Sequence, residues 1–224
     1  MITDCAGAEA VTAEHVCRAA TAALAADGAV LWLATQADRR KLVYATDPVA
    51  RRLDDRQFVL GEGPCVRAWT VGELVLASDL TSDASAARWP LFAPAAVTAG
   101  AGALFAFPLR VGAIRLGALG LYRAKPGPLT DGQLADGLTF ASAATGVVLA
   151  ATQPTTSGAQ PTWWFDEQGE DWTEVYQATG MVAAQLNASL EVAFVRLRAH
   201  AFTTEESLVE IARQVVARTL RLSP

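Results

Sequence analysis

Two apolar runs decide the fold of the first half of the chain: ALFAFPLRV at residues 103–111 and RLGALGLYR at residues 115–123. Each run has the length and composition of a β-strand. Only Gly112, Ala113 and Ile114 separate them, and so short a connection is typical of antiparallel neighbours. The two runs therefore predict a β-hairpin.

Further strand-like runs precede this hairpin. They are AVLWLAT at 29–35, KLVYAT at 41–46, FVLG at 58–61 and ELVLASD at 73–79. The first two flank the polar QADRR and predict a second hairpin. A helix is expected from Thr12, as its N-cap, to Ala26, and a second from Thr130, which forms a capping box with Gln133, to Ala151. This order predicts an α+β fold, an antiparallel sheet flanked by helices, which we expect on one face.

Composition narrows the class of protein. Apolar residues make up 52% of the 224 residues and charged residues 18%, which is enough material for a buried core and argues against disorder. The net charge of −5 argues against non-specific attraction of the whole surface to nucleic acid. We find no signal segment, and the apolar runs are interrupted before the roughly 18 residues that a membrane span needs. A cytoplasmic protein without membrane contact is expected.

Residues for catalysis or metal binding are scarce. The three cysteines, Cys5, Cys17 and Cys65, are scattered and odd in number, which favours free thiols in a reducing cytosol. The two histidines, His15 and His200, lie outside the strand-forming region, so a haem ligand is not expected. No Ser-His-Asp set and no metal-ligand spacing is present. We predict that the chain is no enzyme and holds no metal or cofactor.

A change of composition divides the chain. Residues 152–162 read TQPTTSGAQPT, without charge or amphipathic period, and WWFDEQGEDW follows at 163–172. We therefore predict a first domain at residues 1–151, a linker at 152–171 and a second domain at 172–224.

The second domain shows three successive helical patterns, which predict a small three-helix bundle. Their core positions are Trp172, Val175, Thr179, Val182 and Leu186; then Leu190, Ala193, Phe194, Leu197 and Ala201; then Leu208, Ile211, Ala212, Val215 and Leu222. A capping box of Thr203 and Glu206 is expected to start the third helix.

The second of these helices is apolar on two sides. Val192, Val195 and Ala199 lie opposite its core stripe. A helix of this kind is expected to be covered from both sides, either by self-association or by the first domain. We therefore predict a homodimer.

The first domain resembles the GAF domains of actinobacterial regulators over residues 27–151. The resemblance is carried by FVLGEGPCVRAW, VLASDL, RWPLFAPAAVTAG, FAFPLRVG and RLGALGLYR. It implies a cavity for a small ligand between the sheet and its covering loops, or a module for dimerisation and signal relay. The candidates for lining this cavity are Cys65, Trp69, Trp89 and Phe92. The alternative for these four residues is ordinary packing.

The second domain resembles the ANTAR domain, an RNA-binding antitermination module. The resemblance covers QATGMVAAQLNASLEVAFVRLRAHAFTTEESLVEIARQVVARTLRL from end to end. Its marks are Ala178, Gly180, Ala193, the LRxxA pattern of Leu197, Arg198 and Ala201, and Ala212. It implies binding to tandem hairpins in a leader RNA, which prevents formation of a terminator. The RNA-binding candidates are Arg198, Arg196, His200 and Arg213.

Charge supports a local RNA site only weakly, because residues 175–224 hold five Arg against four Glu. Two copies on one transcript would gain affinity through effective concentration. We therefore expect an RNA-binding transcription antiterminator whose first domain senses a small ligand or receives a signal from a protein. The alternatives are a dimerising scaffold that binds only protein and, more remotely, a reductase that uses Cys65, although no resolving cysteine lies in the same loop.

Overall fold

The computed structural model describes residues 11–35, 39–152, 170–204 and 206–222. The chain divides into two compact units, residues 1–162 and 163–224. Most of the predicted linker, residues 153–169, lies outside the described residues, and the first helix of the second unit begins at Glu170.

One antiparallel sheet forms the centre of the first unit, with the strand order β2-β1-β5-β4-β3. The strands are β1 (Gly28–Thr35), β2 (Arg39–Ala45), β3 (Val75–Ala77), β4 (Ala103–Val111) and β5 (Ile114–Arg123). Both predicted hairpins are confirmed, since β1 pairs with β2 and β4 pairs with β5. The second hairpin turns at Gly112 and Ala113, with Val111 opposite Ile114.

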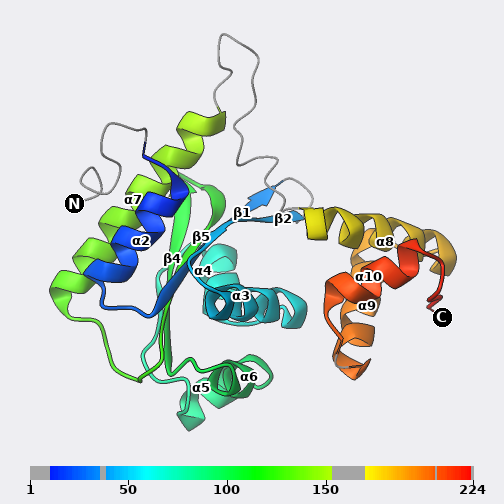
Figure 1. Cartoon of the computed structure of the whole chain (residues 1–224), viewed down its shortest axis with the longest axis horizontal. Coiled ribbons are helices and arrows are strands. Elements are labelled where there is room, and N and C mark those ends of the chain that lie inside the picture. Colours follow the sequence, from blue (N-terminus) through cyan, green and yellow to red (C-terminus); the bar gives the residue numbers. More distant parts are fainter. Residues whose placement is uncertain (1–10, 36–38, 153–169, 205, 223–224) are drawn as a thin grey trace. The chain divides into compact units, whose positions relative to one another are not determined.

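Helices cover both faces of this sheet, not one as predicted (Figure 1). On one face lie α2 (Ala13–Ala23) and α7 (Asp131–Thr152), which pack side by side. On the other lie α3 (Pro48–Leu60) and α4 (Pro64–Val71), followed in the chain by α5 (Asp83–Arg88) and α6 (Phe92–Thr98). The first five residues of β4 are all buried, because a strand covered on both faces has no solvent side.

The expected strand at residues 58–61 is wrong, because FVLG forms the last turn of α3. The Asp47 carboxylate accepts hydrogen bonds from the backbone N–H groups of Val49 and Ala50, and Pro48 occupies the first turn. Gly61 ends the helix in the left-handed conformation, with φ of 67°. Periodicity cannot assign an apolar run of four residues, whereas these end signals identify a helix.

The two outer helices of the first unit begin as predicted. Thr12 caps α2, and Thr130 and Gln133 form the capping box of α7. By length and composition, residues 131–151 of α7 are long and apolar enough to cross a membrane, which the sequence analysis did not predict. The same composition is expected of a helix that covers a sheet, and α7 packs on α2 and β4 through buried residues such as Phe140 and Ala144.

The second unit is the predicted set of three helices: α8 (Glu170–Leu186), α9 (Leu190–Thr204) and α10 (Leu208–Val216). Most predicted core positions are buried. They are Val175, Ala178, Thr179 and Val182; Ala193, Leu197 and Ala201; and Leu208, Ile211, Ala212 and Val215.

Three expectations for this unit are corrected. Leu190 is exposed, because it stands at the first turn of α9. The helix α10 begins at Leu208 with Ser207 as its N-cap, so Thr203 does not start it. It ends at Val216, so Leu222 lies beyond the helix.

Candidate functional site

The four predicted cavity residues lie together in the core between the sheet and the helices on its α3–α4 face. Cys65, Trp89 and Phe92 belong to one cluster of buried residues, and the half-buried Trp69 packs against it. Trp69 meets Trp32 of β1 edge to face, with 5.8 Å between the ring centroids. The structure thus brings together residues from α4, α6 and the end of α5, and their part in binding a ligand stays a prediction.

The segment LGEGPC connects two helices and also holds α6 in place. One carboxylate oxygen of Glu62 accepts hydrogen bonds from the backbone N–H groups of Leu91 and Phe92, at 2.7 and 2.6 Å. Because these N–H groups open α6 and have no partner within the helix, Glu62 supplies their missing acceptor. The loop before α4 is therefore fixed to the helix that carries Phe92.

Cys65 lies in a tightly packed place. A Cβ atom added to Gly120 of β5 would come within 2.5 Å of the Cys65 Sγ, so only glycine leaves room for the sulfur there. Burial raises the pKa of the thiol to about 11, against smaller lowering effects from Gln57, Arg40 and Trp32. A thiol in this environment stays protonated at neutral pH and is a poor nucleophile.

We expect Cys65 and Cys17 to resist alkylation by iodoacetamide at pH 8 in the folded protein. Burial raises the pKa of Cys17 to about 12, so both thiols hold far less of the reactive thiolate than an unfolded chain does. Peptide mass spectrometry after a timed reaction, in native buffer and in urea, measures this. Rapid native labelling of Cys65 would contradict the buried site.

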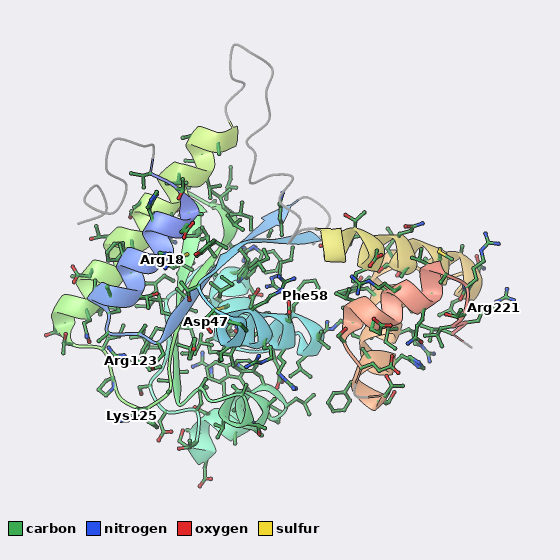
Figure 2. All side chains as sticks on the ribbon, in the orientation of Figure 1. Arg18, Asp47, Phe58, Arg123, Lys125 and Arg221 are labelled. Carbon is green, nitrogen blue, oxygen red and sulfur yellow. The ribbon has the colours of Figure 1, made fainter. Side chains whose placement is uncertain are left out.

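Sequence reasoning missed a buried ion pair beside this cluster. Arg40 of β2 and Asp54 of α3 pair with side chains only 3% and 1% exposed. The Arg40 guanidinium also lies over the rings of Trp32 and Phe58, at 5.4 and 5.2 Å from their centroids; Figure 2 labels Phe58 on α3. The helix-end signals of α3 could have predicted this burial. They define a helix in which Asp54 follows Ala50 by one turn, so that both residues lie on the buried side of the helix.

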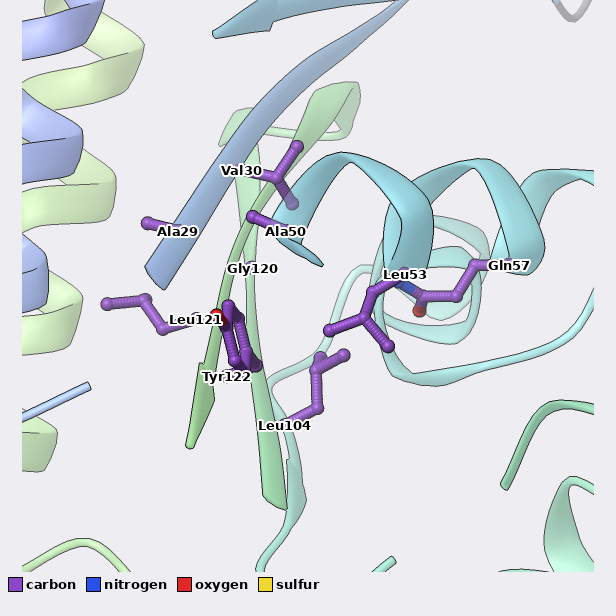
Figure 3. Close-up of a pocket in the computed structure, with 9 residues that line it drawn as sticks. All are labelled: Ala29, Val30, Ala50, Leu53, Gln57, Leu104, Gly120, Leu121 and Tyr122. Carbon is purple, nitrogen blue, oxygen red and sulfur yellow. The ribbon is translucent and has the colours of Figure 1, made fainter. Parts of the chain in front are cut away.

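A small cavity lies between the sheet and α3 (Figure 3). Its volume of about 10 Å³ corresponds to a single water molecule. Its lining is apolar except for Gln57 and Tyr122 and includes none of the four predicted residues. The Tyr122 hydroxyl donates to Asp47 at 3.2 Å, which leaves Gln57 as the polar group of interest.

In the second unit, α9 presents the predicted RNA-binding residues on different sides. Arg196 is exposed, and the half-buried His200 lies one turn later on the same side. Arg198 stands about 200° from Arg196 around the helix and covers the Phe194 ring, 5.7 Å from its centroid. Burial lowers the pKa of Arg198. The helix therefore offers two cationic edges rather than one patch.

Arg213, the fourth predicted residue, lies on α10 and is engaged by carboxylates. Its Nε donates to Glu174 of α8 at 2.8 Å, and Glu210 lies 3.8 Å from its Nη1. These contacts neutralise much of its charge, although half of the side chain is exposed. Among the described residues, no group of three or more His, Cys, Asp and Glu side chains is placed to hold a metal ion.

Comparison with known proteins identifies the family of the first unit. A model of the GAF domain family matches residues 8–149. No curated protein matches the chain.

The chain is also similar to several solved structures. A domain assigned to a two-component sensor histidine kinase of Sinorhizobium meliloti 1021 is 22% identical, with a TM-score of 0.49 over 61% of this chain and 88% of that one. The GAF domain of an Acinetobacter phosphoenolpyruvate-protein phosphotransferase is 13% identical, with a TM-score of 0.46 over 61% and 79%. The GAF-B domain of DevS from Mycobacterium smegmatis is 17% identical, with a TM-score of 0.42 over 61% and 90%.

The family match includes all five strands and six helices from α2 almost to the end of α7, and it stops before the three-helix unit. The match spans well over half of the chain. The chain therefore belongs to the GAF domain family, and its first unit is a sensor or signalling domain of the GAF fold.

Proposed function

We propose that the chain is a signal-responsive, RNA-binding regulator of transcription termination that acts in the cytoplasm. In this proposal the GAF domain senses a small ligand or receives a signal from a protein, and the three-helix unit binds hairpins in a leader RNA. The chain is not an enzyme. The ANTAR-like sequence of the second unit is the main support.

The observation that carries the RNA part is the placement of the LRxxA residues on α9. Leu197 and Ala201 are buried against the neighbouring helices, which fixes the rotation of α9. That rotation leaves Arg196 on the exposed surface and Arg198 along the edge of the core. An arginine side chain donates through a planar fork that matches phosphate oxygens, so α9 is suited to contact an RNA backbone.

We expect Arg198→Ala to weaken binding to a tandem-hairpin leader RNA about 10- to 100-fold, and Arg196→Ala to weaken it less. The loss corresponds to about 1.5–3 kcal/mol for a hydrogen bond to a charged group. Fluorescence anisotropy at several salt concentrations measures the affinity. The RNA is selected from leader transcripts of the organism that encodes the chain.

The controls separate a specific contact from loss of charge or fold. Arg221→Ala removes one exposed positive charge elsewhere in the same unit, as Figure 2 shows, and is expected to have a smaller effect. Arg198→Lys keeps the charge but loses the fork. Circular dichroism must remain unchanged, because Arg198 also covers Phe194. Equal affinities for wild type, Arg198→Ala and Arg196→Ala would refute the RNA assignment.

A second candidate function rests on a different feature, the exposed apolar stripe of α9. The stripe consists of Val192, Val195, Ala199 and Phe202. Three of these are large side chains with about half of their surface exposed. A contiguous apolar surface of this kind favours a protein interface, so we also propose a homodimer. A dimerising scaffold without RNA affinity is the alternative, which the anisotropy experiment distinguishes.

A further inference from the structure

Three buried N–H groups on uncharged side chains of the GAF domain have no hydrogen-bond partner among the described residues. They are Trp32 Nε1 of β1, Gln57 Nε2 of α3 and Trp69 Nε1 of α4, here called the donor cluster. A buried donor without an acceptor destabilises a fold by about 1–3 kcal/mol. Native proteins contain few such groups, so three in one domain core require an explanation.

The three groups lie around the Cys65 side chain. Trp69 contacts Trp32 edge to face. Burial raises the pKa of the Cys65 thiol, and Gln57 and Trp32 oppose this rise, although neither donates to the sulfur with hydrogen-bond geometry. Gln57 is held by its other end, because its Oε1 accepts from the Cys65 backbone N–H at 2.7 Å. Its NH₂ group is therefore fixed in place without an acceptor.

Gln57 also joins the donor cluster to the small cavity between the sheet and α3. Its side chain is 1% exposed and lines that cavity, and Figure 3 shows its amide reaching from α3 toward β5. Gly120 lines the same cavity and packs against the Cys65 sulfur. The space of about 10 Å³ is too small for more than one water, so a larger molecule requires side chains to move.

Trp69 is the side chain best placed to move. Its Nε1 is buried, but the residue as a whole is only half-buried. Its helix α4 has eight residues and lies between two glycines with positive φ, Gly63 at 126° and Gly72 at 76°. Because Trp69 packs against Trp32, its displacement would expose the donor cluster on the α4 side.

The buried charges of the domain indicate whether the donor cluster suits a charged or an uncharged ligand. Among the described residues, Arg40 and Asp54 are the only buried charged groups, and they pair with each other. A bound anion or cation would have to compete with this pair for a counter-charge and would carry a large desolvation cost. An uncharged molecule with hydrogen-bond acceptors satisfies the three donors without that cost.

We propose that the donor cluster recognises the ligand of the GAF domain, and that this ligand is a small uncharged molecule presenting hydrogen-bond acceptors such as ring nitrogens or carbonyl oxygens. This inference rests on the sensor part of the proposed function. Binding places the acceptors against Trp32, Gln57 and Trp69 and shifts α4 outward.

Two small probes of equal size test the chemical class. Pyridazine is an uncharged ring with two adjacent acceptor nitrogens, and benzene has the same ring without acceptors. Each is titrated at millimolar concentration into the ¹⁵N-labelled full chain, and the indole N–H signals are followed by NMR. Trp32→Phe and Trp69→Phe assign two of these signals. We expect pyridazine to shift both of them and benzene to shift neither comparably.

Matched aromatic variants test the hydrogen bonds. Trp69→Phe removes one donor and keeps an aromatic ring, so pyridazine binding is expected to weaken about threefold to tenfold. Tyr44→Phe also removes one donor and keeps the aromatic ring, but Tyr44 lies on β2 beside Glu14, outside the donor cluster, and this variant is expected to change binding little.

Two results would overturn the proposal. Equal shifts with benzene and pyridazine would indicate an apolar cavity, and no shift with either probe would indicate donors satisfied by ordered water only. RNA anisotropy on the same preparation keeps the two proposals apart. A pyridazine response without RNA binding refutes the RNA function and leaves the ligand class standing, whereas RNA binding without a probe response refutes only the ligand class.

Discussion

Replacing Asp54 with alanine is expected to lower the free energy of unfolding of the GAF domain by about 3–5 kcal/mol. Asp54 is the partner of Arg40, and both side chains are almost fully buried. Removal of the carboxylate takes away the buried ion-pair partner of the guanidinium. Such a loss is a large part of the 5–15 kcal/mol that stabilises an ordinary domain. Urea unfolding of the full chain, followed by tryptophan fluorescence, measures it.

Two further variants show whether the charge or the packing is responsible. Glu73→Ala removes an exposed carboxylate and is expected to change stability by less than about 0.5 kcal/mol. The double variant Arg40→Met with Asp54→Leu replaces the pair by apolar groups and is expected to recover most of the stability, because neither charge is then buried alone. If Asp54→Ala matches Glu73→Ala, the buried pair does not stabilise the fold.

The sequence predicts the elements of this fold where two independent signals agree. The β4–β5 hairpin has apolar runs together with a short turn, and α7 has an apolar pattern together with the Thr130–Gln133 capping box. The strand expected at 58–61 rested on an apolar run alone, and the caps of α3 outweighed it. A sheet covered on one face does not account for the uninterrupted apolar stretch at the start of β4, which is typical of a strand buried on both sides.

The candidate site could be predicted only in its apolar part. The sequence motifs singled out Cys65, Trp69, Trp89 and Phe92, and the fold places them in one cluster. The polar groups were missed because Gln57 and Asp54 are usually surface residues, and only the register of α3 turns them inward. Without that helix no pattern connects these residues with β1 and α4.

The double variant Val192→Glu with Val195→Glu is expected to abolish the proposed homodimer. Both valines lie on the apolar stripe of α9, at 48% and 54% exposure, opposite the buried Ala193 and Leu197. If the stripe pairs with a second copy, the variant places four unpaired carboxylates in one interface. The desolvation of these charges is expected to raise the dissociation constant at least about a hundredfold. Helical circular dichroism is expected to persist, because the core side of α9 is unchanged.

Sedimentation at micromolar concentration measures the assembly, and Gln177→Glu with Ala184→Glu is the matched control. That control adds two glutamates at exposed positions on α8, outside the stripe, and is expected to remain dimeric. A monomeric wild type would refute the dimer. A dimer that survives the α9 variant but dissociates in Leu138→Glu with Leu149→Glu would move the interface to the exposed side of α7, where these leucines are 49% and 39% exposed. Two copies joined at either face carry two sets of α9 arginines, which would raise the effective concentration of the proposed RNA-binding residues on a transcript with tandem hairpins.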